Sequence, residues 1–223
     1  MNVSKRNLKG FTLVELLVVI TIIAALLAIL LPAMAKAKLQ ADVLIVNHDL
    51  YQIGLAIEAY ETANNGKWPP VRYDCMAAEH MYSLPPELVD GGYITGSRNG
   101  AIHSSNIEDR YYKGHSYKYM SVETALNLYG TSAPDRYLYV STNFPTGTDG
   151  KLVKYTKRSE SPVKWVLFSL GPNYDKTKTR SFELDKGFPV ANSFWYSPKT
   201  KKGILTRIKT NKDQYVGTFQ SGR

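Results

Sequence analysis

The chain has 223 residues, a formal net charge of +9, one cysteine and sixteen tyrosines. Because Cys75 is the only cysteine, an intramolecular disulfide and a cysteine-rich metal site are both excluded. The basic excess is mild, so it favours acidic surfaces or polyanions without requiring either. The length is sufficient for one soluble domain beside a membrane helix.

A long apolar run follows a short basic stretch at the N-terminus. Lys5, Arg6 and Lys9 come first with no acidic residue among them, which predicts a cytoplasmic N-terminus. The 21 residues from Phe11 to Leu31 carry one charge, on Glu15. As a helix they would extend about 32 Å, enough to cross the hydrocarbon core of a bilayer. A carboxylate inside such a segment costs roughly 2.5–3.5 kcal/mol, so we expect Glu15 to have a function and a partner.

The basic leader, Gly10-Phe11, Glu15 and the apolar run together resemble the N-terminus of type IV pilins and of the pseudopilins of type II secretion systems. The resemblance implies that a prepilin peptidase cuts between Gly10 and Phe11, that Phe11 is then N-methylated, and that Glu15 acts in assembly. Cleavage would leave a positive α-amine on Phe11 at the edge of the apolar phase. The Glu15 carboxylate of a neighbouring subunit could neutralise that amine, so that neither charge stays unpaired in a low dielectric.

Two other interpretations of the run stay open. It could be an ordinary secretory signal peptide with a cleavage site at Ala33-Met34-Ala35, or a plain single-pass anchor. The length of the run, the presence of Glu15 and the helical pattern that follows all weigh against the signal peptide.

The helix is predicted to run from Phe11 to about Ala63, with an interruption and kink at Pro32. Beyond Lys38 it becomes amphipathic, and we expect its apolar seam to lie across a sheet rather than in a coiled coil. Asn64-Asn65-Gly66 and Pro69-Pro70 should end the helix. The seam is spaced 4, 3, 4, 3, 4, 3 and consists of Leu39, Val43, Val46, Leu50, Ile53, Ile57 and Tyr60.

The predicted fold class is α+β, with the long helix packed on a C-terminal antiparallel sheet of three to five strands. The expected divisions are a leader at 1–10, a transmembrane and assembly helix at 11–35, an amphipathic helix half at 36–64, a variable loop region at 65–135 and the sheet region at 136–223. Short helices are expected at 85–88 and 123–129, and a surface loop at 96–116. Strands are expected at 116–122, 136–142, 151–157, 163–170, 193–196 and 204–209.

Catalytic and metal-binding patterns are weak in this sequence. None of the four histidines makes a His-x-x-x-His or His-Glu-x-x-His pair, and neither a Gly-x-Ser-x-Gly motif nor a phosphate-binding glycine loop occurs. The chain is therefore not expected to be an enzyme. The resemblance to major pseudopilins suggests one ligand, calcium, between residues 170 and 185. The candidate ligands are Leu170 through its carbonyl, Asp175 and Asp185, although four basic residues in the same stretch oppose a dication.

Six basic residues near the C-terminus are interpreted as a solvated face rather than a specific nucleic-acid site, since no recognised nucleic-acid motif accompanies them. They are Lys199, Lys201, Lys202, Arg207, Lys209 and Lys212.

The resemblance implies a structural subunit of the secretion type, similar to the G-type major pseudopilins; the lone Cys75 departs from the disulfide of many type IV pilins. Such a subunit is held in the inner membrane with a periplasmic C-terminal domain, and polymerises with itself and other pseudopilins. The implied partners are the prepilin peptidase, membrane lipid and an inner-membrane assembly platform with a separate ATPase. A type IV pilus subunit for adhesion, motility or DNA uptake is the alternative, and a membrane-anchored enzyme or binding protein is a third.

Overall fold

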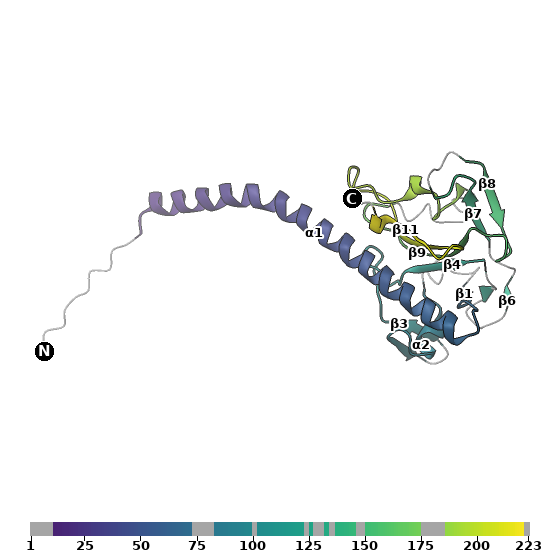
Figure 1. The fold of residues 1–223 in the computed structure, drawn as a ribbon. Coiled ribbons are helices and arrows are strands. Elements are labelled where there is room, and N and C mark those ends of the chain that lie inside the picture. The colour runs from purple at the N-terminus through teal and green to yellow at the C-terminus, as the bar shows by residue number, and fades with distance from the viewer. Residues whose placement is uncertain are drawn as a thin grey trace, which may run out of the picture. The chain divides into compact units, whose positions relative to one another are not determined.

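The computed structural model describes residues 11–72, 83–99, 102–122, 125–126, 132–133, 137–145, 150–174 and 186–220. The chain divides into two compact units, residues 1–41 and residues 42–223. In the described part of the first unit the backbone is helical from Leu13 onward. The helix α1, Leu13–Ala63, is continuous in Figure 1 and continues into the second unit.

Helix α1 ends where the sequence predicts. Asn65 and Gly66 both have positive φ, 54° and 76°, which reverses the chain after the last helical turn. The amide of Gly66 donates to the carbonyl of Glu61 at 2.8 Å, and the amide of Asn64 donates to that of Tyr60 at 2.9 Å. The last carbonyls of the helix are therefore satisfied by the turn that follows it.

The main sheet of the second unit has four antiparallel strands in the order β11-β10-β9-β4. They are β4, Lys118–Ser121; β9, Val163–Ser169; β10, Leu205–Thr210; and β11, Tyr215–Gly217. The prediction of an α+β fold with a three- to five-stranded antiparallel sheet is confirmed. The sheet does not lie wholly beyond residue 135, however, because β4 comes from the segment that we expected to be variable.

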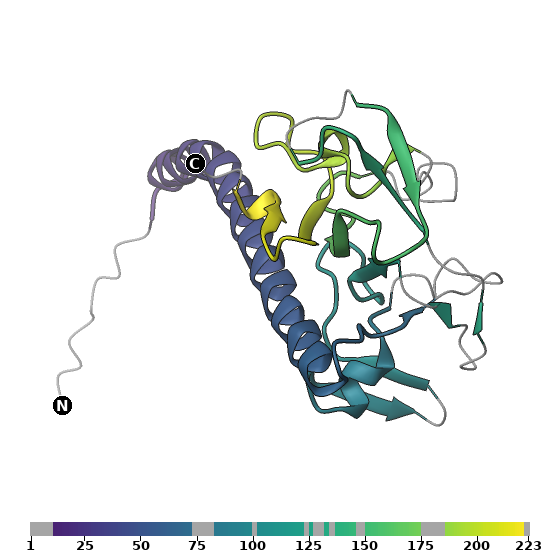
Figure 2. The ribbon, with the colours of Figure 1, turned by 45° about the vertical axis from the view of Figure 1, so that its right-hand side comes forward.

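Both faces of this sheet are buried, and the side chains of β9 alternate between the two core clusters that cover them. Trp165 and Leu167 belong to one core cluster, which includes Val46, Leu50 and Ile53 of α1. Val166, Phe168 and Leu170 belong to a second cluster on the other face. The alternation predicted for 163–170 and the packing of the helical seam on a sheet are therefore both confirmed. Figure 2 shows the C-terminal strands and the 3-10 helix η5, Thr218–Gln220, beside this part of α1.

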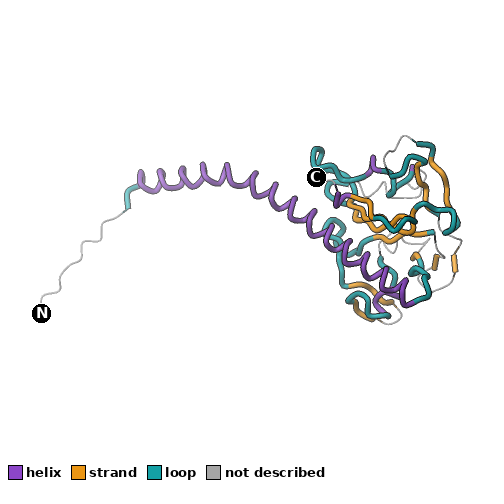
Figure 3. Tube along the Cα trace, in the orientation of Figure 1, coloured by secondary structure: helices purple, strands orange, loops and turns teal. Residues whose placement is uncertain are grey.

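Smaller elements surround the main sheet, and loops connect them over much of the unit (Figure 3). Helix α2, Pro86–Asp90, begins with a proline in its first turn, as predicted. The remaining strands are the hairpin β2, Gly96–Asn99, with β3, Ile102–Ser105; the small sheet of β1, Val71–Arg72, β5, Ala125–Leu126, and β6, Ser132–Ala133; and the hairpin β7, Leu138–Ser141, with β8, Leu152–Tyr155.

Three local predictions are wrong in the described residues. Part of the segment predicted as a surface loop forms the β2–β3 hairpin. Residues 125–126 form a strand that pairs with β1 and β6, where we expected a short helix. The strand expected at 193–196 is instead the 3-10 turn η4, Asn192–Phe194, followed by an isolated bridge from Trp195 to Ile204. In the first two cases strand pairing overrides the local pattern, and in the third the described segment forms isolated bridges instead of a strand.

Candidate functional site

The N-terminus of α1 is capped by three reciprocal hydrogen bonds between Thr12 and Glu15. The Thr12 amide and hydroxyl donate to the Glu15 carboxylate at 2.9 and 2.8 Å, and the Glu15 amide donates to the Thr12 hydroxyl at 3.2 Å. This arrangement is a capping box, in which Thr12 and Glu15 satisfy backbone groups that the first helical turn leaves unpaired. The resemblance to pilins implied a role for Glu15 in assembly alone. The Thr-x-x-Glu spacing before an apolar run was the signal that would have revealed the cap.

The apolar residues that follow Glu15 have no packing partner in their own unit. From Leu13 to Leu31 the large apolar side chains are between 44% and 79% exposed, and Phe11 is 75% exposed. In the part of the chain that the structure describes, α1 is the one helix long and apolar enough to cross a membrane. An apolar surface of this extent needs a bilayer or other protein to cover it.

The other predicted site residues are placed as follows. Helix α1 continues through Pro32 without a break, so the interruption expected there is wrong, whereas the kink stays a prediction. Leu170 is fully buried, whereas Gly10, Asp175 and Asp185 lie outside the described residues. Among the residues that are described, no group of three or more histidine, cysteine or acidic side chains is placed to hold a metal ion. The calcium site is neither supported nor contradicted by this geometry.

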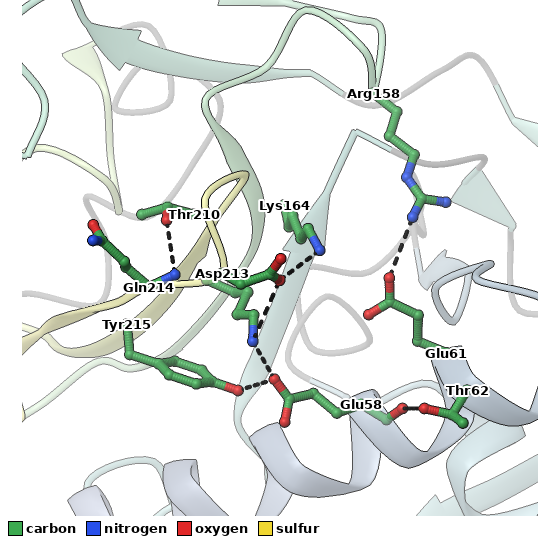
Figure 4. Close-up of polar contacts among 10 residues, drawn as sticks. Glu58, Glu61, Thr62, Arg158, Lys164, Thr210, Asp213, Gln214 and Tyr215 are labelled. Carbon is green, nitrogen blue, oxygen red and sulfur yellow. Dashed lines mark hydrogen bonds and ion pairs between the residues drawn. The ribbon is translucent and has the colours of Figure 1, made fainter.

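A polar network joins the second half of α1 to the C-terminal strands of the sheet. Glu58 accepts hydrogen bonds from Lys209 and from the Tyr215 hydroxyl. Asp213 accepts from Lys164 at 2.7 Å and lies 3.6 Å from the Lys209 ammonium group. Figure 4 shows Glu58 on the helix directed toward Tyr215, with Asp213 and Lys164 above it in the view. One helix residue therefore ties together strands β10 and β11.

The ionisation of Glu58 follows from these contacts. Partial burial opposes the charged form, but the hydrogen bonds from Lys209 and Tyr215 outweigh it, and the pKa of Glu58 lies below its ordinary value of 4.5. Burial raises the pKa of the Tyr215 phenol, and its hydrogen bond to the Glu58 carboxylate raises it further. Glu58 is thus held as a carboxylate and Tyr215 as a neutral donor.

Arg207 lies beside this network and is enclosed by aromatic rings. Its guanidinium carbon is 4.0 Å from the centre of the Tyr215 ring, 4.8 Å from Phe219 and 4.9 Å from Tyr51. Gly54 permits this approach, because a Cβ atom there would lie 3.2 Å from Trp165 and 3.3 Å from the Arg207 Nε atom. Even a methyl group at position 54 would require the Trp165 or Arg207 side chain to shift slightly.

The solvated basic face predicted near the C-terminus is wrong for two of its six residues. Arg207 and Lys209 are each only 8% exposed and face the helix, since they alternate with Thr206 and Ile208 along β10. Lys199, Lys201, Lys202 and Lys212 are exposed, as expected. The inward orientation of Arg207 and Lys209 was not predicted, because the position of a lysine or arginine in a strand does not indicate which distant carboxylate or aromatic ring its side chain will contact.

Comparison with known proteins supports the reading of the N-terminus. Residues 5–31 match the model of the prokaryotic N-terminal methylation motif. Over 60 residues, 27% of its length, the chain is 45% identical to the type IV wide pilus major component PilA4 of Thermus thermophilus. Over 93 residues, 40% of its length, it is 32% identical to the type II secretion system core protein G of Aeromonas hydrophila.

These matches are partial, since the chain spans 46% and 64% of the lengths of these two relatives. A search of solved structures gave no significant match. Three observations agree with one another: the methylation motif, the similarity to one pilus protein and one type II secretion protein, and the long N-terminal helix packed on an antiparallel sheet. The chain therefore carries the prokaryotic N-terminal methylation motif and a pilin-like α+β fold, and it is similar to a type IV pilus component and to a type II secretion core protein.

Proposed function

We propose that this chain is a pseudopilin, a structural subunit that polymerises into a periplasmic fibre for type II protein secretion. In this proposal the prepilin peptidase removes residues 1–10 and Phe11 is N-methylated. The apolar half of α1 first holds the subunit in the inner membrane, with its C-terminal domain in the periplasm. The assembly platform and its separate ATPase then move the subunit into the fibre.

The observation that carries the proposal is the exposed apolar surface from Leu13 to Leu31. It is uncovered in its own unit, and it begins at a motif associated with N-terminal methylation. A bilayer covers such a surface before assembly, and the helices of other subunits cover it afterward. The second unit has a complete core of its own, so it would remain folded during the transfer from one environment to the other.

Glu15 would have a role both in the membrane-held subunit and in the assembled fibre. Before assembly its carboxylate accepts hydrogen bonds from Thr12 of the same chain. In the fibre it would meet the α-amine on Phe11 of a neighbouring subunit, which offsets two charges that are costly when buried alone. In the assembly step the Glu15 carboxylate would therefore exchange neutral hydrogen-bond donors, the Thr12 amide and hydroxyl, for the charged α-amine of Phe11.

Mass spectrometry of the N-terminus of the protein isolated from its native membrane tests the processing. The expected chain begins at methylated Phe11, and a chain that begins at Lys36 would indicate an ordinary signal peptide. In addition, Glu15→Ala should leave the protein made, cut and membrane-bound but poorly assembled. Normal fibre yield from Glu15→Ala would contradict the proposed role of this residue.

A type IV pilus subunit is the second candidate, favoured by the 45% identity to a wide pilus component. We favour secretion because the match to the secretion protein covers more of this chain, 40% against 27%, and because Cys75 cannot form an intramolecular disulfide. Deletion of the chain in its native host separates the two. Loss of protein secretion without loss of long surface fibres supports the first, and the reverse supports the second.

A further inference from the structure

A turn between η4 and β10, residues 197–202, presents three lysines to solvent, and we call it the lysine turn. Lys199, Lys201 and Lys202 are all exposed, and among the described residues none of them forms an ion pair. No aspartate or glutamate occurs anywhere in 186–212. The positive charge of the lysine turn is therefore not neutralised by its own segment of chain.

The backbone of the lysine turn is fixed by hydrogen bonds. The Ser197 amide donates to the Lys202 carbonyl at 3.1 Å, and the Lys201 amide donates to the Ser197 carbonyl at 2.8 Å. From outside the turn, the Asn173 side-chain amide donates to the Lys201 carbonyl at 3.1 Å. Binding of a partner would therefore cost only the side-chain freedom of the lysines, since the backbone that carries them is already ordered.

The contacts of β10 with α1 indicate where the lysine turn lies in the second unit. Lys209 is bound to Glu58, whereas Arg207, two residues earlier on the strand, lies against Tyr51, about two turns earlier on the helix. Going back along β10 therefore leads back along α1 toward Asp42, the first residue of the unit. The lysine turn precedes β10 and so lies toward that end.

Tyr196, which directly precedes the lysine turn, agrees with this position. Burial raises the pKa of Tyr111, and the Asp42 carboxylate and the Tyr196 phenol raise it further because both lie near the Tyr111 side chain. Arg110, the neighbour of Tyr111, lies 3.4 Å from Asp42. The lysine turn is therefore at the Asp42 end of the second unit.

Two carboxylates belong to the same end, and they do not cancel the three lysine charges. Asp42 is already paired with Arg110. Glu108 is exposed and accepts a hydrogen bond from the Gly114 amide at 2.6 Å, so it offsets at most one positive charge. A net positive charge therefore remains at this end and favours an anionic partner.

The chain on the other side of Asp42 leads to the apolar run. Only residues 32–41 separate Leu31 from Asp42, and a helix of ten residues spans about 15 Å. Two of those residues, Lys36 and Lys38, are also exposed and basic. A bilayer that covers the run up to Leu31 is therefore close, along the chain, to the end of the unit that carries the lysine turn.

We propose that the lysine turn binds anionic lipid head groups of the membrane that holds the subunit before assembly. Lysine ammonium groups are compact charges on flexible stems, and clusters of them beside a membrane segment are attracted to anionic lipid. The inference rests on the membrane-held state of the proposed function. It adds a contact that the subunit must break when it leaves the membrane for the fibre.

Amine footprinting of the full-length protein in vesicles tests the contact. The protein is reconstituted in phosphatidylcholine, or in an equal mixture of phosphatidylcholine and phosphatidylglycerol, and acetylated lysines are quantified by mass spectrometry. Acetylation of the three lysines should be about threefold slower in the anionic vesicles and should recover in high salt. Lys212, which is exposed between β10 and β11 at the other end of the strand, is the control and should be acetylated at the same rate in both.

Matched substitutions separate the lysine turn from positive charge in general. A fluorophore on Thr200→Cys, in a Cys75→Ser background, reports by energy transfer its proximity to an acceptor attached to lipid head groups. Replacing the three lysines of the turn by glutamine should lower energy transfer in anionic vesicles to its value in phosphatidylcholine. A control variant removes the same charge from exposed positions elsewhere and should leave energy transfer unchanged; it combines Lys67→Gln, Lys151→Gln and Lys212→Gln. Equal thermal unfolding of the two variants would establish that neither is misfolded.

The outcomes separate this inference from the function on which it rests. Equal acetylation of the turn in both kinds of vesicle, or equal slowing at Lys212, would overturn it. Protection in the native membrane but not in anionic vesicles would indicate an acidic protein partner and would overturn it as well. If the chain forms fibres while the turn stays unprotected, the proposed function stands without this contact. If the unmodified chain is not retained in the membrane at all, both proposals fail.

Discussion

The two halves of α1 share one backbone geometry and differ in what covers them. Between Leu13 and Leu31 the large apolar side chains are all exposed, whereas Val46, Leu50, Ile53 and Ile57 are at most 1% exposed. The first half is apolar on every side, so no single protein face could cover it. The second half concentrates its larger apolar residues on one face, and the sheet covers that face. The distribution of apolar residues around a helix therefore indicates whether an apolar environment surrounds it or a single protein surface covers one of its faces.

The largest expected effect is the difference between two alanine substitutions, one in each half of α1. Ile53→Ala removes a fully buried side chain beneath the sheet and should lower the free energy of unfolding of residues 42–223 by about 2–5 kcal/mol. Leu26→Ala, on the exposed half, should leave that free energy unchanged. Denaturant titration of the full-length protein in detergent, followed by tryptophan fluorescence, measures both. Equal losses from the two variants would contradict the division of roles along the helix.

A smaller effect is expected from Glu58, which ties the second half of α1 to the sheet. Because its pKa is lower in the folded protein than the ordinary 4.5, its contribution to stability is present above that value. The contribution is lost as the pH falls through the lower, folded pKa. Glu58→Gln should therefore be less stable than the wild type at neutral pH, and this difference should shrink on acidification below about 4.5.

Thermal unfolding at a series of pH values between 3 and 7 measures this difference. Glu61→Gln serves as the comparison, since its carboxylate is also on the helix but its partner Arg158 is 39% exposed, against 10% for Lys209. A difference for Glu58→Gln that does not change with pH would show that packing, and not the carboxylate, accounts for the loss.

The smallest effect concerns the capping box at the start of the first half. Thr12→Ala removes the hydroxyl that accepts from the Glu15 amide and donates to its carboxylate. Amide hydrogen exchange in the first turn of α1 should become about fivefold faster in detergent micelles. Thr21→Ala is the control, because the Thr21 hydroxyl bonds only to the Val18 carbonyl within the helix. Unchanged exchange in Thr12→Ala would mean that the cap does not order the turn.

Much of the architecture was predictable because it depends on patterns local to a few turns. The spacing of Val46, Leu50, Ile53 and Ile57 was sufficient to identify the seam, and the Asn-Asn-Gly sequence was sufficient to locate the end of the helix. The alternation in 163–170 predicted both faces of β9. Each of these signals is carried by residues whose periodicity alone determines which way they face.

The sequence by itself determined the membrane-compatible helix, its processing motif and the alternation of the strongest strand, since these depend on composition and on spacing along the chain. The tertiary structure alone decided that Arg207 and Lys209 face inward, that strand β4 joins the sheet and that strand β5 pairs with β1. The physical reason is the same in each case. A buried cation or a paired strand is stabilised by a partner far away in the chain, and no local pattern names that partner.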